Sequence, residues 1–126
     1  MHVVVNFAIP PEQAPKVWTW QSVDRFLEEA VKITGLTRVG DPVVKECGDL
    51  LIGFQIIAES HVSVHLDRGS GRGWADVFSC GEVDEAKVAK VVDATLMVPG
   101  GMLTIGTLPR GNLEEGGEPC PTAPSK

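Results

Sequence analysis

The chain has 126 residues, of which 43% are hydrophobic and 22% charged, and its net charge at pH 7 is −6. This length fits one domain with its own core. The acidic balance argues against nucleic acid as the main partner, because phosphate binding needs clustered Lys and Arg. No run of 18 apolar residues predicts a membrane span, and the N-terminal residues lack the features of a signal peptide. Three cysteines without a CxxC pair predict no disulfide framework and favour a reducing, cytoplasmic location.

The first predicted elements are a strand and a helix. Val3–Ile9 is short and β-branched, which is typical of a buried strand, and two prolines end it. Residues 10–21 are expected to form a loop. A helix is predicted from Ser22 as its cap to about Thr34, since apolar residues recur there at helical spacing. Gly35 is expected to end this helix.

Strands dominate the next part of the chain. Three are predicted, over residues 37–47, over 50–64 as one long bent strand, and over 73–79. A second helix is predicted from Asp84, and a Pro-Gly-Gly turn leads to a last strand over Met102–Thr107. This order predicts an α+β sandwich in which two helices cover one face of a largely antiparallel sheet. The domain is expected over residues 1–109, and the Gly-, Pro- and Glu-rich residues 110–126 are expected to be a disordered tail.

Two segments bear on function. The chain reads AESHVSVH over residues 58–65 and DVFSCG over 76–81. These strings resemble the ES-H-x-[ST]-[IV]-H processing motif and the D-[VL]-F-[TS]-C-G motif of bacterial S-adenosylmethionine decarboxylases. The resemblance extends over residues 2–107, and its specific part lies within 58–81. It implies that family's fold, a role in polyamine biosynthesis, and self-cleavage between Glu59 and Ser60 into products 1–59 and 60–126.

The resemblance also implies a cofactor, a pyruvoyl group made from Ser60. Decarboxylation of an amino acid leaves a carbanion, which needs an electron sink. A pyruvoyl ketone supplies one, because it forms a Schiff base with the substrate amine. The Ser60 hydroxyl would attack the Glu59 carbonyl in an N-to-O acyl shift. Elimination and hydrolysis would then leave the pyruvoyl group at the new N-terminus.

Two further residues take catalytic roles by the same resemblance. His65 is expected to be the acid–base group of processing, and its alternative is an ordinary strand histidine. Cys80 is expected to donate the proton to the substrate carbon, and its alternative is a small buried hydrophobic residue. Strict alternation along a strand places Ser60 and His65 on opposite faces, so their meeting requires a bend or a bulge. His61, next to the cleavage site, ranks second.

The sequence departs from the family after the histidine. Thr-Trp-Pro-Glu is replaced by Leu66-Asp67-Arg68-Gly69, which removes the glutamate associated with the ribose hydroxyls. A second aromatic residue, expected to stack on adenine, falls at Glu46, and a second processing serine falls at Ile52. The stacking and ribose-binding groups are therefore missing at these positions.

Acidic groups stand in their place, which bears on the substrate. Asp67 and Glu46 suit a distal ammonium or guanidinium group, so the sequence predicts L-arginine or L-ornithine as substrate. S-adenosylmethionine, decarboxylated to supply aminopropyl groups for spermidine, is the alternative. In that case the acidic residues are solvated, and aromatic residues such as Trp74 or Phe54 take over the stacking.

The remaining expectations concern partners. No residue spacing is typical of a metal site. The resemblance implies that the two cleavage products stay together and pair into a homodimer, with the sites near its interface. The rival is a non-enzymatic binding module or an unprocessed paralogue on the same fold. Glu59-Ser60, His65 and Cys80 together at the family's spacing favour the enzyme.

Overall fold

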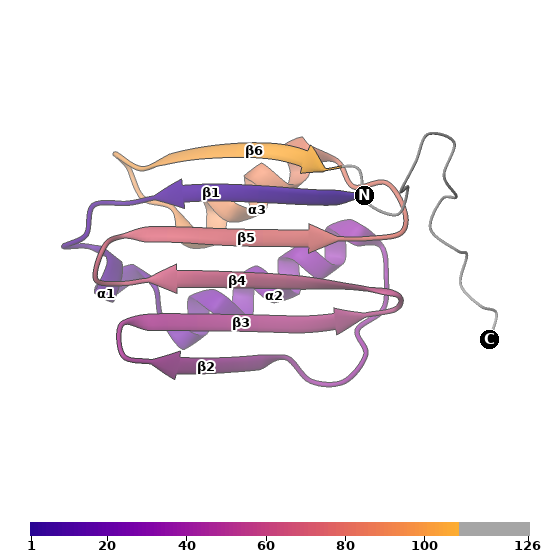
Figure 1. Cartoon of the computed structure of the whole chain (residues 1–126), viewed down its shortest axis with the longest axis horizontal. Helices are drawn as coiled ribbons and strands as arrows, with labels where there is room; N and C mark the ends of the chain where they lie inside the picture. The colour runs from indigo at the N-terminus through magenta and orange to yellow at the C-terminus, as the bar shows by residue number, and fades with distance from the viewer. Residues whose placement is uncertain (109–126) are drawn as a thin grey trace.

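The computed structural model describes residues 1–108, which form one antiparallel sheet with helices on one face (Figure 1). The sheet has six strands in the order β2-β3-β4-β5-β1-β6. The predicted α+β sandwich is confirmed. The strands are β1 (His2–Ala8), β2 (Val43–Cys47), β3 (Leu50–Ile57), β4 (Ser60–Asp67), β5 (Arg72–Phe78) and β6 (Met102–Leu108). The helices are α1 (Ala14–Val17), α2 (Trp20–Thr34) and α3 (Glu85–Leu96).

The core lies between the sheet and the two long helices. Alternate residues of each central strand are buried on this side, as the two-residue period of a strand requires. Helix α2 approaches the sheet closely over Gly53, where a Cβ atom would stand only 2.4 Å from Cγ1 of Val23. The glycine is therefore needed for the contact between this helix and β3.

Helix α2 begins earlier than the sequence predicts. Thr19, not Ser22, is its N-cap: the Thr19 side chain accepts a hydrogen bond from the Ser22 backbone, and the Ser22 side chain accepts one from the Thr19 backbone. The helix ends at Gly35, whose φ of 71° is left-handed, as expected. The short α1 lies in the segment predicted to be a loop. Asp84 caps α3 as expected, accepting a hydrogen bond from the Ala86 backbone.

The single long strand predicted over residues 50–64 is wrong. The chain turns back at Ala58 and Glu59, so that β3 and β4 pair as a hairpin with Ile57 opposite Ser60. Glu59 has a φ of 66°, a left-handed conformation that residues other than glycine seldom adopt. Because neither turn residue is Gly, Asn or Asp, the turn has no signal in the sequence. Ser60 is consequently the first residue of a strand.

The strand predicted over residues 37–47 is also shorter than expected. It is confined to β2, because Gly40 adopts a φ of 78° and Pro42 follows shortly after it. Upstream of this break, Arg38 forms an isolated bridge with Ile57. The predicted tail, residues 110–126, lies outside the described residues.

The face of the sheet opposite the helices is here called the open face. Within residues 1–108 no helix covers it (Figure 1). Large apolar side chains are exposed on it: Val43, Phe54, Ile56, Trp74, Met102 and Leu108. Exposed apolar side chains gathered on one face are typical of a surface that binds something.

Candidate active site

The predicted cleavage site lies where β4 begins, beside the end of β5. The Ser60 hydroxyl donates a hydrogen bond to the carbonyl oxygen of Glu59 at 2.6 Å. It accepts one from the backbone N–H of Cys80 at 3.2 Å. Sγ of Cys80 lies 3.4 Å from the same Glu59 oxygen. The structure thus brings together three residues that the sequence selected.

Strand pairing in the sheet positions both Ser60 and the segment that carries Cys80. Ser60 follows the β3–β4 turn directly, and the ladder between β4 and β5 ends with His61 opposite Phe78. Beyond that pair, the Ser79 N–H donates to the carbonyl of Met1 at 2.9 Å, which ties the segment carrying Cys80 to the start of β1. The left-handed Glu59 stores of the order of 1–2 kcal/mol of backbone strain. The strained residue is the one whose carbonyl the serine contacts.

This arrangement suits acyl transfer within the chain. A hydroxyl beside a peptide carbonyl is a nucleophile in position, and effective molarity is high when both groups belong to one rigid turn. Cys80 is disulfide-bonded in the structure, which the cysteine count did not predict, whereas Cys47 is free and exposed. Proton donation by the Cys80 thiol therefore requires that it first be reduced.

His65 does not reach Ser60 within one chain. It lies on the open face, directly opposite Ile52 and Trp74. The pairing of β4 with both neighbours is unbroken, so the bulge needed to bring the two side chains together is absent from this strand. Five residues of regular strand separate them by about 16 Å.

A row of rings on the open face, missed by sequence reasoning, borders the cleavage site. His61 stacks on Phe54 with 5.3 Å between ring centroids and lies 5.5 Å from the ring of Phe78. The ring of His2 meets Phe78 edge-on, also at 5.5 Å. These residues come from β1, β3, β4 and β5, so only the register of the sheet reveals the row.

Asp76, from the second motif, lies beside this row. Its Oδ1 is 2.9 Å from Nε2 of His2, and its Oδ2 accepts a hydrogen bond from the Ser63 hydroxyl at 3.2 Å. The carboxylate joins three neighbouring strands on the open face. Its motif position suggested no such role.

Asp67 and Glu46, the residues expected to bind a cationic substrate, lie at the end of the sheet away from Ser60: Asp67 ends β4, and Glu46 belongs to β2. Seven residues of strand place Asp67 about 23 Å from Ser60. Both carboxylates have partners already: Glu46 accepts a hydrogen bond from Nη2 of Arg68 at 2.6 Å, and Asp67 accepts one from the Gly69 N–H at 3.0 Å. Within one chain they form no pocket with Ser60, and the expectation of a basic substrate loses its structural support.

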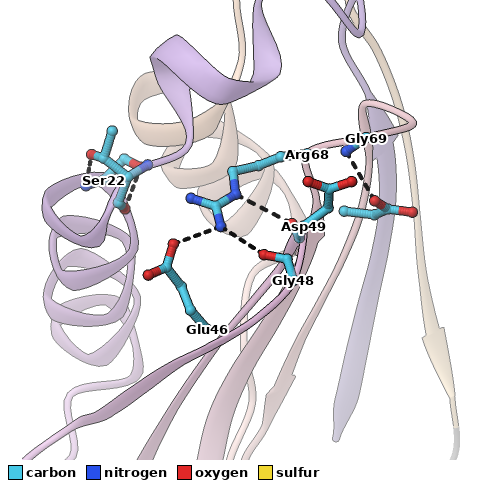
Figure 2. Close-up of polar contacts among 8 residues, drawn as sticks. Ser22, Glu46, Gly48, Asp49, Arg68 and Gly69 are labelled. Carbon is cyan, nitrogen blue, oxygen red and sulfur yellow. Dashed lines mark hydrogen bonds and ion pairs between the residues drawn. The ribbon is translucent and has the colours of Figure 1, made fainter.

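The Arg68 guanidinium makes most of the polar contacts at this corner of the sheet (Figure 2). Besides Glu46, it donates to the carbonyl oxygens of Gly48 and Asp49, each at 3.2 Å. These two residues form the β2–β3 turn, so Arg68 braces one hairpin against the next. The charges at this corner hold turns together.

Two observations limit other kinds of site in residues 1–108. No three His, Cys, Asp or Glu side chains of this part of the chain are grouped as metal ligands. None of its helices is both long and apolar enough to cross a membrane.

Comparison with known proteins gives one consistent result. The sequence profile of the S-adenosylmethionine decarboxylase family matches residues 2–101. The chain is 30% identical over 73 residues to an S-adenosylmethionine decarboxylase proenzyme of Aquifex aeolicus, covering 58% of this chain and 54% of that protein. It is 37% identical over 60 residues to a proenzyme of the same name from Methanococcus vannielii, covering 48% and 49%. Each alignment thus spans about half of the relative.

A solved structure extends the likeness to the fold. The crystal structure of the adenosylmethionine decarboxylase from Aquifex aeolicus superposes with a TM-score of 0.60. The superposition covers 90% of this chain and 95% of that one, at 18% sequence identity. At such low identity the likeness concerns the fold alone.

Proposed function

Because the chain belongs to the S-adenosylmethionine decarboxylase family, we propose that it is a self-processing, pyruvoyl-dependent decarboxylase acting on S-adenosylmethionine. The observation that carries this proposal is the Ser60 hydroxyl, 2.6 Å from the carbonyl oxygen of Glu59 at the bond the motif marks. The matched relatives support S-adenosylmethionine over the arginine or ornithine predicted from Asp67 and Glu46.

Processing uses groups that the site already holds. The Ser60 oxygen attacks the Glu59 carbonyl carbon, the peptide C–N bond breaks, and the nitrogen takes the hydroxyl proton. In the resulting ester the backbone Cα proton is lost and the Cβ–O bond breaks. Glu59 leaves as a carboxylate and residue 60 becomes dehydroalanine. Tautomerisation to an imine and addition of water release ammonia and leave a pyruvoyl group.

The fold around Ser60 is compatible with cleavage and with a pyruvoyl group at the new N-terminus. Ser60 lies at the edge of a two-residue turn, so cleavage there leaves both flanking strands intact. The fragments 1–59 and 60–126 remain joined because β3 pairs with β4, and β1 pairs with both β5 and β6. This pairing supports the expectation that the two products stay together.

Cys80 has a second role, in the decarboxylation of the substrate. Once formed, the pyruvoyl group supplies the ketone that binds the substrate amine and accepts the electrons left by carbon dioxide. Cys80, held beside residue 60 by its own backbone N–H, delivers a proton from its reduced thiol to the substrate carbon.

We further propose that His65 acts on the Ser60 of a partner subunit in a homodimer. Its position about 16 Å from its own Ser60, on an unbroken strand, argues against action within one chain. The open face carries His65 and the exposed apolar side chains, so two such faces packed together would bury apolar surface. Such packing would let one subunit's His65 approach the other's cleavage site.

Mass spectrometry of the purified chain tests the proposed chemistry. We expect two fragments divided between Glu59 and Ser60, the second carrying the mass of a pyruvoyl terminus. Release of labelled carbon dioxide should be fastest from S-adenosylmethionine when compared with L-arginine and L-ornithine. An uncleaved, inactive chain would favour the binding-module rival, and faster release from a basic amino acid would overturn the substrate.

A mixing experiment tests the role of His65. Ser60→Ala and His65→Ala chains should each remain uncut when expressed alone. Co-expressed, they should yield cleavage of the His65→Ala chain, because its partner supplies the histidine. If His65 acts within its own chain, the mixture stays uncut.

A further inference from the structure

Gln55 is a polar side chain at a core position of β3. It lies on the helix side of the sheet and is fully buried. Its Nε2 donates hydrogen bonds to the carbonyl oxygens of Gly40 at 3.1 Å and of Ile56 at 2.9 Å. Within residues 1–108 its Oε1 has no hydrogen-bond partner. Burial of an amide with one unpaired oxygen costs free energy, so packing alone does not explain a glutamine at this position.

The contact with Gly40 lies in a bulge beside β3. The ladder of β2 with β3 starts with Val43 opposite Phe54. Beyond it, the isolated bridge pairs Arg38 with Ile57. These two registers leave four residues of the outer segment opposite two residues of β3. Extra residues on one side of a ladder bend the chain and change its direction, and the buried amide donates to this bulge from inside the core.

Residues 37–40, here called the brace, follow the end of β3 after α2 (Figure 1). The Val39 N–H donates to the carbonyl oxygen of Ile56 at 2.8 Å. The same oxygen accepts a hydrogen bond from Gln55. Gln55 therefore contacts the brace directly at Gly40 and shares with Val39 the acceptor that joins the brace to β3.

The other end of the brace reaches the turn at the cleavage site. The carbonyl oxygen of Thr37 accepts a hydrogen bond from the N–H of Ala58 at 3.0 Å. Ala58 directly precedes Glu59, whose left-handed conformation is strained. A strained residue persists only where surrounding contacts hold it, and the brace supplies one such contact besides the pairing of β3 with β4.

We propose that Gln55 is a positioning residue for self-cleavage: it fixes the brace, and the brace holds the turn that sets the Ser60 hydroxyl against the Glu59 carbonyl. The inference rests on the proposed function and concerns processing alone. After the bond is cut, the turn no longer has to be held. Turnover by the processed enzyme should therefore not depend on Gln55.

The rate of cleavage of Gln55→Met tests this role. Methionine is also long and unbranched but donates no hydrogen bond. In freshly translated, labelled chain, cleavage should be about 10- to 100-fold slower than in the wild type, because a small displacement of reacting groups has an effect of this size. Each cleaved chain should then release carbon dioxide with an unchanged kcat.

Stability separates positioning from a merely structural role. In the uncut Ser60→Ala chain, adding Gln55→Met should leave the urea midpoint unchanged or raise it. The change removes a buried unpaired oxygen, and Gly40 is exposed, so water can bind the carbonyl that loses its partner. A merely structural glutamine would give the reverse, a lower midpoint with normal cleavage.

Hydrogen exchange in the same uncut chain gives a readout that does not need cleavage. Gln55→Met should speed exchange of the Val39 and Ala58 amides by about 10-fold or more, because both hydrogen bonds join the brace to the hairpin. Thr95→Val is the matched control, since it also removes a hydrogen bond of a buried side chain, but in α3. It should leave both exchange and cleavage unchanged.

The outcomes separate this inference from the proposed function. Cleavage of Gln55→Met at the wild-type rate, or unchanged exchange of the two amides, overturns the positioning role while the decarboxylase proposal stands. Gln55→Leu replaces Gln55→Met if that variant fails to fold, with the same expectations. A wild-type chain that is never cut overturns the proposed function, and the role of Gln55 in cleavage with it.

Discussion

Both ends of β4 carry polar groups, but the two ends use them differently. At the Ser60 end, a hydroxyl and the Cys80 sulfur both lie within 3.4 Å of one carbonyl oxygen, that of the left-handed Glu59. At the Asp67 end, charged side chains contact one another and the neighbouring turns. The first end concentrates polar groups on the bond proposed to be cleaved, and the second uses them to brace the fold.

The contrast shows why the acidic residues give no support to the predicted basic substrate. A carboxylate binds a cationic substrate only if its charge is not already neutralised by the protein. Arg68 neutralises Glu46, and the backbone of the following turn uses Asp67. The residue types were right for a cation site, but their partners are internal.

The largest expected effect is at the reactive end. Ser60→Ala should abolish cleavage, because alanine has no oxygen to attack the Glu59 carbonyl. Intact mass would show one chain, with no release of carbon dioxide. Ser63→Ala, the same change three residues along β4, removes only a hydrogen bond to Asp76 and should still be cut. A cleaved Ser60→Ala chain would contradict the proposed chemistry.

Cys80→Ala should separate processing from turnover. The backbone N–H that contacts Ser60 remains, so cleavage should proceed. In a reducing assay kcat should fall by about 100-fold or more, the usual worth of a positioned proton donor. Cys47→Ala changes an exposed cysteine and serves as the control. Full turnover by Cys80→Ala would require another proton donor.

Arg68→Gln should affect stability and not cleavage. The change removes an ion pair and weakens contacts to two turn carbonyls, so urea unfolding should show a loss of about 1 kcal/mol. Lys32→Gln removes the exposed pair with Glu29 and should cost less than about 0.5 kcal/mol. Equal losses in both variants would show that the Arg68 corner is no better braced than an ordinary surface pair.

The smallest effect is expected for Asp67→Asn. Asparagine can still accept the hydrogen bond from the Gly69 N–H, so kcat/KM for S-adenosylmethionine should change by less than about twofold. Steady-state kinetics of the fully processed variant would measure it. A tenfold loss would restore Asp67 to the substrate site, reached across the dimer.

Much of the fold could be predicted from local patterns. Gly35 and Asp84 end and begin helices because their backbone and side-chain chemistry is decided within a few residues. The turn at Ala58 and Glu59 could not be found this way, since neither residue favours a turn and the strands around it are both apolar. Tertiary pairing of β3 with β4 holds Glu59 in its left-handed conformation.

The candidate site shows the same division between what local sequence patterns specify and what strand pairing decides. The sequence by itself identified the family, and it selected the Glu59–Ser60 bond and Cys80 as candidates, because these are carried by contiguous strings of residues. Only the tertiary structure decided that Cys80 lies beside Ser60, that His65 lies far from it, and that Glu46 is paired with Arg68. Those relations depend on strand register, which couples residues about 20 positions apart through backbone hydrogen bonds that a linear pattern does not specify.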